Sequence, residues 1–559
     1  MLRPLRRSRL WLIGAAAILV LALVLRLWGI ATGLPYVYNA DENAHFVPRA
    51  IGMFGHSLNP RYFVNPPGLT YVIHVALALR FGSRDAVGHA MATDPTSVFV
   101  VARLVSALLS TLAVALLLWA GRRMLGGAAG LVAGGLLACS FLAVHYSHLA
   151  LDDAPTLAPV CLTLLGVASI YRHNRARDYA LAGLGLGIAC AFKYTAGVVI
   201  LSVIAAALVS PTAGARVRGL VVAGACALVG FLVFNPFALL DFSAFRDGLQ
   251  HQSETSSDGG GKLGLSQSSG ILYYAGTTTW GLGWLPVLAA LGGAAGTLAT
   301  NRRLAAMLVP PPLALGLFMG VQDRFFSRWL LPAYPLLCLL AGWTTVALGR
   351  RLHDRIRRGG PRPVVAAIGV LLCLQGAVFA IHNDLVLARP DTRQLARDWM
   401  VAHVPIRSKV VIEPFLPAAW AADAQSVTQG TGNGFRWNKW LTTRGRLPGQ
   451  TGPAGVIRFE DYERTTRPAL ISSYTRGGFC WVVTGSTQYG RAYADPGAVP
   501  EAIAYYAALG REGRLVYDVK PTAKGGEPFS YDFSFNAYPL RYSRMGPEIK
   551  IYELHGDRC

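Results

Sequence analysis

The sequence predicts an all-α polytopic membrane protein with about eleven transmembrane helices, followed by a C-terminal mixed α/β extracytoplasmic domain. Three observations predict this fold class. Hydrophobic residues make up 53% of the 559 residues and charged residues only 15%, whereas average soluble domains carry about 25% charged residues. Several apolar runs reach the roughly 20 residues that span a bilayer. The composition becomes that of a soluble domain after residue 382, which divides the chain into domains 1–382 and 383–559.

Clusters of arginine separate the apolar runs and orient them, because basic loops stay on the cytoplasmic side. Four arginines between Arg3 and Arg9 place the N-terminus in the cytoplasm, and every predicted inner loop carries at least two arginines. These clusters account for much of the net charge of +22. Basic charge interleaved with exposed aromatic residues is absent, so the composition excludes a nucleic-acid partner.

The first apolar run is too long for a signal peptide and is read as a retained span. The expected spans are about Leu10–Ile30, Val98–Ala120, Gly126–Val144, Ala154–Ile170, Tyr179–Phe192, Ala196–Ser210, Gly219–Leu240, Tyr274–Thr300, Leu304–Val321, Trp329–Leu348 and Pro363–Ile381. Residues 31–97 form an outer loop, whose apolar piece Gly68–Phe81 is too short to cross and is expected at the interface. A polar, Gly- and Ser-rich loop is expected at Asp241–Gly270.

Residues 383–559 carry short strand patterns, such as those around Val410 and Val482, and a helix at Pro500–Leu509. Of eight cysteines, only Cys480 and Cys559 lie in this part. They are able to pair if the domain is extracytoplasmic, but spacing alone does not give their separation.

Asp41 and Glu42 are adjacent carboxylates just after the first predicted span. A carboxylate at the mouth of a membrane cavity is suited to act as a general base. The alternative is helix capping, because Asn39 with Glu42 three residues later resembles a capping box and Asp41 favours a helix N-terminus. Both readings can hold together, since adjacent helical residues face different ways.

Ionisable residues from distant parts of the chain fall on the predicted outer face, where such groups are costly and usually functional. They are Asp41, Glu42, His45, His145, His148, Asp152, Asp153, Lys193, Asp323, Arg324 and Arg328. A fixed cation at Lys193 suits a phosphate, although a lysine there can also snorkel to the interface. Arg328 can grip phosphate oxygens or act as an interfacial anchor beside Trp329.

Two pairs have the spacing of metal ligands on one helical face, Glu42 with His45 and His145 with His148. Either pair would need Asp152 or Asp153 to complete a divalent site. Hydrogen-bonded structural histidines explain this spacing more simply. We therefore expect no metal or other cofactor to be required.

Short stretches in a fixed order carry a resemblance to a known family. They are Asp41-Glu42, Arg61 to Pro67, His148 to Pro155, Phe192 to Thr195, Arg328 to Pro335, Asp391 to Arg393 and Met545 to Pro547. With them the sequence resembles the integral-membrane glycosyltransferases of the GT-C superfamily, in particular the branch of protein O-mannosyltransferases and lipid A aminoarabinose transferases. The resemblance covers nearly the whole chain and rests on order and topology rather than on one motif.

The resemblance implies a GT-C-like membrane domain and transfer of a sugar from a polyprenyl-phosphate carrier, with inversion at the anomeric carbon. It places the catalytic carboxylate on Asp41, beside Glu42, and a second outer aspartate on Asp153. Lys193 and Arg328 would contact the donor phosphate. A lipid, glycan or protein would accept the sugar on the outer face of the membrane.

The matched stretches and the outer-face group supply the remaining substrate-binding candidates, which are His45, Arg61, Tyr62, His148 and Tyr194. One departure concerns Asn65, which stands where the aminoarabinose branch has a lysine before a Pro-Pro pair. The sugar and the acceptor therefore stay open.

A polytopic transporter or flippase of lipid-linked or small polar substrates is the alternative, because intramembrane charges and broken helices also mark transporters. The charges lie at the outer face and no inverted repeat is evident, which favours the enzyme. The Arg-, Ala- and Gly-rich composition points to a bacterial plasma membrane.

Overall fold

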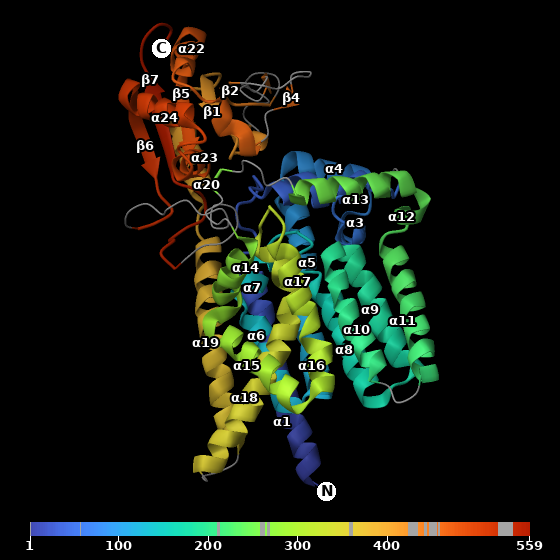
Figure 1. Ribbon diagram of the computed structural model, residues 1–559. Helices are drawn as coiled ribbons and strands as arrows, with labels where there is room; N and C mark the ends of the chain where they lie inside the picture. Colours follow the sequence, from blue (N-terminus) through green and yellow to red (C-terminus); the bar gives the residue numbers. More distant parts are fainter. Residues whose placement is uncertain are drawn as a thin grey trace.

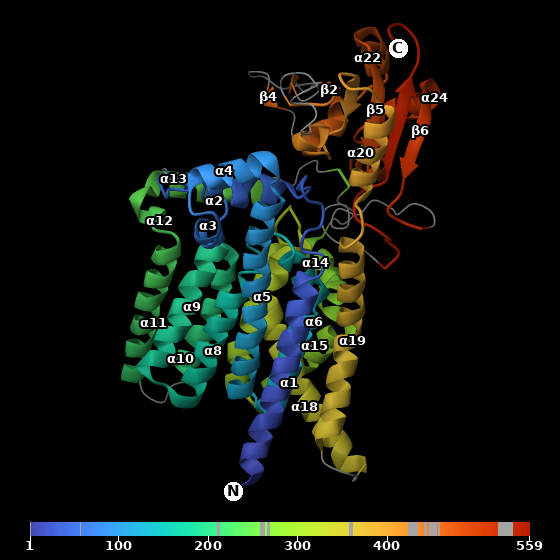
Figure 2. The same ribbon diagram turned by 180° about the vertical axis from the view of Figure 1, so that it is seen from behind.

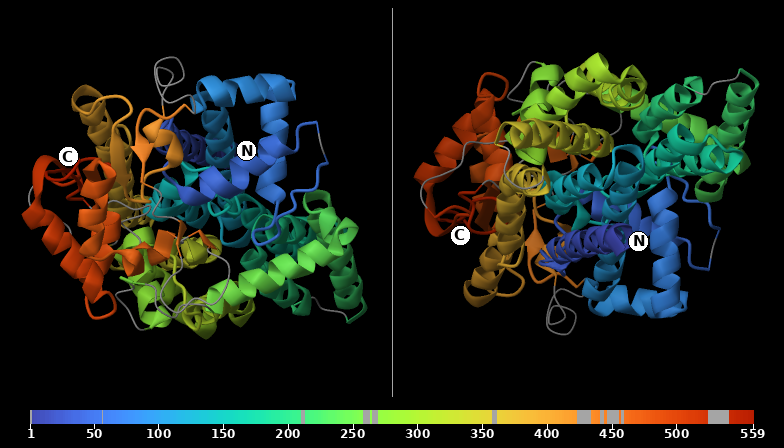
Figure 3. Two further views of the ribbon diagram at one scale, coloured as in Figure 1. Left: turned by 90° about the horizontal axis from the view of Figure 1, so that it is seen from above. Right: turned by 90° about the horizontal axis from the view of Figure 1, so that it is seen from below.

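The computed structural model describes residues 2–55, 57–209, 213–257, 263–264, 269–356, 361–422, 434–440, 444–445, 455–456, 459–523 and 540–559. A tall helical bundle carries a smaller domain with a β-sheet at one end, and the N-terminus lies at the other end (Figures 1 and 2). Viewed along the bundle, the C-terminal domain covers one side, away from the green helices around residue 230 (Figure 3).

The secondary-structure elements of the membrane part are all helices in the residues described. Its elements are α1 (Leu2–Leu27), η1 (Glu42–Phe46), α2 (Val47–Gly52), α3 (Gly68–Phe81), α4 (Arg84–Thr93), α5 (Thr96–Met124), α6 (Gly127–Cys139), α7 (Phe141–Ser147), α8 (Leu157–His173), α9 (Ala176–Phe192), η2 (Tyr194–Val199), α10 (Ile200–Leu208), α11 (Ala213–Phe234), α12 (Phe237–Leu240), α13 (Phe242–Ser257), α14 (Gly270–Thr278), η3 (Thr279–Gly283), α15 (Trp284–Thr300), α16 (Arg302–Leu308), α17 (Pro310–Gly320), η4 (Ser327–Ala333), α18 (Tyr334–Ile356) and α19 (Pro361–Leu387).

Within the described residues, 7 helical stretches are long and apolar enough to cross a membrane, or up to 8 if the bent pair α6–α7 counts as one span. This number is lower than the expected eleven. The difference lies mainly in α8, α9 and η2–α10, which stand where spans were expected but are shorter than 18 residues. A polytopic helical membrane domain is therefore confirmed, and the finer number of crossings is not.

The expected polar loop at 241–270 is in part a helix. The helix α13 occupies its first half and lies across the end of the bundle that faces the C-terminal domain (Figure 1). The sequence pattern favoured a loop because its Gly and Ser residues are concentrated in the second half. Most of that half lies outside the described residues.

Small residues set the closest helix contact in the bundle, between α9 and α11. A Cβ atom on Gly183 would lie 2.0 Å from the Ala223 carbonyl oxygen, and one on Gly187 would lie 1.9 Å from that of Ala227. Membrane helices approach closely where such residues leave room, because packing rather than hydrophobicity drives their association. The glycine spacing in α9 therefore serves packing.

A buried arginine supports the break between α6 and α7, which bends the pair by 55°. The fully buried Arg26 of α1 donates to the carbonyl oxygens of Leu137 (3.2 Å) and Ala138 (3.1 Å), just before the break. It also donates to Ser110 Oγ of α5 at 2.8 Å. Backbone carbonyls freed inside a bilayer need such partners. The break allows the chain after α7 to turn back as a buried loop, residues 148–156, which leads into α8.

The C-terminal domain is a mixed α/β structure, as expected. Its elements are α20 (Thr392–His403), β1 (Lys409–Ile412), η5 (Ala418–Ala421), β2 (Asn438–Lys439), β3 (Arg444–Gly445), β4 (Gly455–Val456), η6 (Phe459–Thr465), α22 (Ala469–Gly477), β5 (Phe479–Gly485), α23 (Ser486–Ala494), α24 (Pro500–Glu512), β6 (Gly513–Val519) and β7 (Ile549–Leu554). Five strands form one sheet in the order β2-β1-β5-β7-β6. β1 is parallel to β2 and β5, and β7 is antiparallel to β5 and β6.

The sheet divides two small cores, because successive strand residues face opposite sides. Val410 and Ile412 of β1 pack with α20 and Trp420 on one side. Val411 packs with α22 and α24 on the other side. Cys480 and Cys559 form a disulfide with a Cα–Cα distance of 5.3 Å, so the end of the chain is tied to β5.

Candidate functional site

Five ionisable side chains from distant segments form one charge cluster. Arg328 donates to Asp41 Oδ2 at 2.8 Å, and its Nε lies 3.4 Å from Asp153 Oδ2. Lys193 Nζ lies 2.5 Å from Asp153 Oδ1 and 3.6 Å from Asp152 Oδ1. These five residues are called the charge cluster below. The structure brings together five of the eleven outer-face residues that the sequence had only placed on one side.

The members of the charge cluster lie at helix ends or in the loops between helices. Asp41 directly precedes η1, and Arg328 lies in the first turn of η4. Asp152 and Asp153 lie in the loop between α7 and α8, and Lys193 joins α9 to η2. Residues between helices have backbone groups and side chains free for other contacts. The loop of Asp152 and Asp153 begins at His148, which lines a pocket together with Arg393 and Met545, so the cluster sits at the end of the bundle that carries the C-terminal domain.

The members differ sharply in exposure. The Asp41 side chain is 38% exposed, whereas that of Asp153 is 2%, that of Lys193 11% and that of Arg328 12%. Asp41 is thus the carboxylate that an incoming molecule can reach. Asp153 lies beneath it and contacts both cations. This arrangement suits a reactive carboxylate above a fixed pair of cations.

Burial shapes the protonation of the deeper groups. Burial raises the pKa of Asp152 to about 7, although the Lys193 ammonium opposes the shift. Burial alone would lower the pKa of Lys193, but Asp152 and Asp153 outweigh it and raise this pKa, so Lys193 stays charged. The carboxylates of Asp41 and Asp153 pair with the Arg328 guanidinium, and Asp153 also pairs with the Lys193 ammonium. The cations still have N–H donors to spare, because an ammonium has three and a guanidinium five.

Glu42 lies outside the charge cluster. Its carboxylate is fully buried and accepts two hydrogen bonds of 2.8 Å from Arg103 of α5. It also accepts from the Ala150 N–H at 3.0 Å. Such a doubly bonded pair orients groups rather than exchanging protons. The geometry therefore places Glu42 in a structural ion pair, and its expected catalytic role stays a prediction.

The helix-capping alternative proposed for Asp41 and Glu42 can be compared with the hydrogen bonds of Asn39. Asn39 Oδ1 accepts a hydrogen bond from the Glu42 N–H at 3.1 Å. The Asp41 side chain makes no capping hydrogen bond. Asn39 thus caps the turn, and the Asp41 carboxylate stays available to Arg328.

His45 and Tyr62 form a stacked pair beside Asp41. Their ring centroids are 4.9 Å apart with an interplanar angle of 7°, and the Arg49 guanidinium lies 4.1 Å from the Tyr62 ring centroid. Tyr62 Oη accepts a hydrogen bond from Asn65 Nδ2 at 3.1 Å. Burial, aided by the Asp41 charge, raises the pKa of Tyr62 to about 12. Asn65, which replaces the lysine of the aminoarabinose branch, therefore orients a tyrosine.

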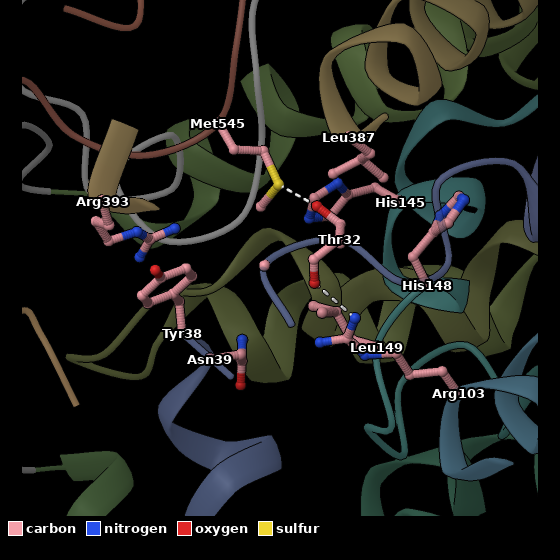
Figure 4. Close-up of a pocket in the computed structure, with 11 residues that line it drawn as sticks. Thr32, Tyr38, Asn39, Arg103, His145, His148, Leu149, Leu387, Arg393 and Met545 are labelled. Atoms are coloured by element: carbon pink, nitrogen blue, oxygen red, sulfur yellow. Dashed lines mark hydrogen bonds between the residues drawn. The ribbon is translucent and has the colours of Figure 1, made fainter. Parts of the chain in front are cut away.

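His148 is held as a buried structural group. Its ring nitrogens lie 2.9 Å from the Val144 carbonyl oxygen and 3.0 Å from that of Trp28. With His145 it lines a pocket at the junction of bundle and C-terminal domain, which Arg393 and Met545 close from above (Figure 4). This arrangement fits the simpler explanation of the histidine spacing. Among the described residues, no group of three or more His, Cys, Asp or Glu side chains is placed to hold a metal.

Among the described side chains, the two remaining candidates, Arg61 and Tyr194, form no hydrogen bond or ion pair with the charge cluster. Tyr194 follows Lys193 directly, and its hydroxyl donates to the Phe63 carbonyl at 3.0 Å. The Arg61 side chain is exposed. These residues line the first external loop rather than the cluster.

Sequence reasoning missed Arg103, which fixes Glu42, and the aromatic rings around Arg328. The Arg328 guanidinium lies 4.6 Å from the Phe326 ring centroid and 5.8 Å from that of Tyr146. A signal for Arg103 was present, because a lone arginine inside an apolar run is rarely tolerated without a partner. The aromatic contacts left no such signal, since aromatic residues are common in membrane spans.

Comparisons with known proteins agree with this picture. Residues 95–239 match the PMT_2 family model, described as dolichyl-phosphate-mannose-protein mannosyltransferase. This range includes Asp152, Asp153 and Lys193. A search of curated proteins found no match.

Similar folds occur among solved structures. The chain is similar to ArnT from Cupriavidus metallidurans bound to undecaprenyl phosphate, with 14% identity, 97% of each chain covered and a TM-score of 0.53. The apo state of that protein gives 15% identity, 98% of each chain and 0.50. The Archaeoglobus fulgidus oligosaccharyltransferase gives 13% identity and 0.53, over 96% of this chain and 77% of the other. At these identities the likeness shows the fold.

Proposed function

We propose that this chain is a membrane glycosyltransferase that depends on a lipid-phosphate-linked sugar, and that it moves the sugar from a polyprenyl-phosphate donor to an acceptor hydroxyl at the charge cluster. The PMT_2 match over residues 95–239 and the ArnT-like fold support this proposal. The observation that carries this proposal is Asp41. It is a half-exposed carboxylate fixed by Arg328, directly above the buried ion pair of Asp153 with Lys193.

Asp41 is the general base of the proposed reaction. The acceptor oxygen attacks the anomeric carbon while Asp41 takes its proton, and the bond from this carbon to the phosphate oxygen breaks. The electron pair of that bond leaves with the polyprenyl phosphate. Because this is a single displacement, the configuration at the anomeric carbon inverts.

Lys193 and Arg328 stabilise the charge that grows on the leaving phosphate. Asp153 holds both cations in place before the donor arrives, so the site needs little rearrangement. The ArnT structure with undecaprenyl phosphate supports a lipid phosphate as the leaving group. Lys193 and Arg328 can supply the positive charge, so we propose that no metal is required.

His45 and Tyr62 form a flat aromatic surface next to Asp41 and are proposed to contact the sugar or the acceptor. Arg61 and Tyr194 would line the approach from the first external loop. His148 would act indirectly, by fixing the loop that carries Asp152 and Asp153. The acceptor would be a lipid, a glycan or a protein.

The reaction is placed on the outer face of a bacterial plasma membrane, with the N-terminus in the cytoplasm. The domains 1–382 and 383–559 would then be a catalytic membrane domain and an extracytoplasmic domain. The disulfide between Cys480 and Cys559 supports this side, since disulfides persist in oxidising compartments.

The decisive test is Asp41→Asn. The amide keeps the shape and can still accept from Arg328, but it cannot take a proton. Loss of a general base lowers rates by about 10²–10⁴-fold. Polyprenyl-phosphate sugars that accumulate in a deletion strain, identified by mass spectrometry, supply the donor for the assay with purified protein. If Asp41→Asn keeps more than about a tenth of the wild-type rate, Asp41 is not the base.

A further inference from the structure

The segment between α1 and Asp41 lies between the bundle and the C-terminal domain. Tyr36 and Tyr38 pack against the core around α20 and Trp420. Val37, between them, is 3% exposed and belongs to the core of the bundle. The segment thus points alternately into the two parts of the molecule. We call residues 36–38 the strap.

Two arginines of α20 hold the strap from above. The Arg393 guanidinium lies 3.7 Å from the centroid of the Tyr38 ring, and that of Arg397 lies 5.1 Å from the Tyr36 ring. Figure 4 shows Arg393 against the face of Tyr38. A cation over an aromatic face is attracted by the ring quadrupole, more strongly where water is excluded.

Both arginines are themselves fixed. Arg393 donates to both oxygens of Asp391, at 2.9 and 2.6 Å. Arg397 donates to the carbonyl oxygens of Trp420 and Ala422, at 2.8 and 2.9 Å. Hydrogen bonds to planar guanidinium groups set their orientation as well as their position. The arginines therefore present preformed contacts to the strap.

The backbone of the strap shows that it is constrained from both sides. Val37 has a φ of 45°, a value that a β-branched residue adopts only under strain. Such a conformation persists where the surrounding structure determines it. Here Val37 is buried in the bundle while its neighbours are held by α20.

Asp41 follows the strap by three residues. On the other side of Asp41, Glu42 is locked to Arg103 and to the Ala150 N–H. Asp41 is therefore fixed from the C-terminal domain through the strap and from the bundle through Glu42. A misplacement of about 1 Å in a reacting group can cost 10²-fold in rate.

We propose that Arg393 and Tyr38 are positioning residues that set the Asp41 carboxylate against Arg328 from the C-terminal domain. This inference rests on the proposed role of Asp41. It makes the C-terminal domain part of the catalytic apparatus rather than a cover alone. Arg397 and Tyr36 support the same contact.

Side-chain substitutions separate the ring face of Tyr38 from its hydroxyl. Among the described residues Tyr38 Oη has no hydrogen-bond partner, so Tyr38→Phe keeps the contact and should stay within about twofold of the wild-type kcat. Tyr38→Leu removes the ring and should lower kcat by about 10- to 100-fold. The KM for donor should change little, because Lys193 and Arg328 are untouched. Arg393→Met should match Tyr38→Leu, and Arg393→Lys should recover part of the loss.

A matched control exists in the same domain. Lys409 lies over the Phe479 ring at 5.5 Å, on β1 and β5 and outside the strap. Lys409→Met removes a comparable cation–aromatic contact and should leave kcat unchanged. Thermal unfolding of each variant in detergent shows whether it is folded, and Arg393→Lys serves if Tyr38→Leu does not fold.

Hydrogen–deuterium exchange gives a readout independent of activity. The amides of Glu42 and Asn43 donate to Asn39 in the native turn, and in Tyr38→Leu they should exchange faster than in wild type. Unchanged exchange and unchanged kcat in Tyr38→Leu would overturn the positioning role, even if Asp41→Asn is inactive. Faster exchange with an active Asp41→Asn would instead overturn Asp41 as the base and leave the strap contact standing.

Discussion

The side chains of Asp41 and Glu42 illustrate how adjacent residues acquire different chemistry. Asp41 meets Arg328 near the surface, and Glu42 meets Arg103 in the interior. A buried charge is tolerated only with a partner, so removing one member of the inner pair is costly. The outer pair is partly solvated and can open to a substrate. Burial, rather than residue type, separates the two carboxylates.

Glu42→Gln should therefore act on folding more than on chemistry. Loss of one charge from a buried pair costs about 3–5 kcal/mol, because the Arg103 charge remains without its partner. We expect a lower unfolding temperature in detergent and, for the protein that is folded, a kcat that falls much less than in Asp41→Asn, because Gln keeps the shape that holds the turn after Asp41. The double variant Glu42→Gln with Arg103→Gln should be more stable than Glu42→Gln alone. A stable Glu42→Gln protein with no activity would instead restore Glu42 to the catalytic group.

Lys193→Met and Arg328→Met should weaken donor use. A charge-assisted contact to phosphate is worth about 1.5–3 kcal/mol, so kcat/KM for donor should fall by about 10- to 100-fold. Initial rates at varied donor concentration measure this. Arg246→Met is the control, since Arg246 lies on α13 with a side chain that is 69% exposed. Normal donor kinetics in both variants would contradict the phosphate assignment.

At the scale of the secondary-structure elements, strand β1 is followed directly by Glu413, a fully buried carboxyl group outside the site. It accepts hydrogen bonds from the Gly485 N–H at 2.9 Å and from the Tyr506 hydroxyl at 2.8 Å. Burial raises its pKa to about 8, with the Glu463 charge adding to the shift and the Arg491 charge opposing it. Glu413 is therefore protonated in the folded domain at neutral pH.

This group makes the stability of the C-terminal domain depend on pH. Between the unfolded pKa of 4.5 and the folded value of about 8, the folded state keeps a proton that the unfolded state loses. The free energy of unfolding should therefore fall as pH rises through this window. Thermal unfolding in detergent from pH 5 to pH 8 measures it. Glu413→Gln should flatten the dependence, whereas Glu501→Gln on the exposed turn of α24 should leave it unchanged.

Elements differ in how far the sequence predicts them. Long apolar runs such as α5 and α19 were placed correctly because hydrophobicity and length define a span. The helix α13 was missed because its polar composition gives no membrane signal, and it is held by the end of the bundle.

In the site, Asp41, Asp153, Lys193 and Arg328 were expected on one face, and the structure brings them together. Their pairing depends on tertiary packing that no local pattern encodes, and so does the separation of Glu42.

At the scale of the whole molecule, the catalytic assignment requires one membrane topology. The C-terminal domain lies at one end of the bundle and the N-terminus at the other (Figure 1). The charge cluster lies at the end with the C-terminal domain, because Asp41 closely follows Tyr38, whose ring is contacted by Arg393 of that domain. Reporter fusions after Arg355 and after Asp398 should therefore report the cytoplasmic and the outer side, respectively. Arginine-rich loops favour this orientation. Fusions that report the same side at both positions would contradict the proposed topology.

The buried Arg26, in the last turn of α1, has a consequence for how the chain inserts into the bilayer. Its nearest backbone acceptor outside α1 is 111 residues further along the chain, and Ser110 is 84 residues further. At about 5–20 residues per second, synthesis delivers the first of these carbonyls roughly 5–20 s after Arg26 itself. During that interval α1 carries in its last turn a cation whose partners on α5 and α6 have not yet formed. The cost is smaller than the roughly 2.5–3.5 kcal/mol of a cation at the centre of an inserting helix. We therefore expect α1 to remain at the insertion machinery until α5 and α6 have been synthesised. During this interval the nascent protein should be most susceptible to quality-control proteases.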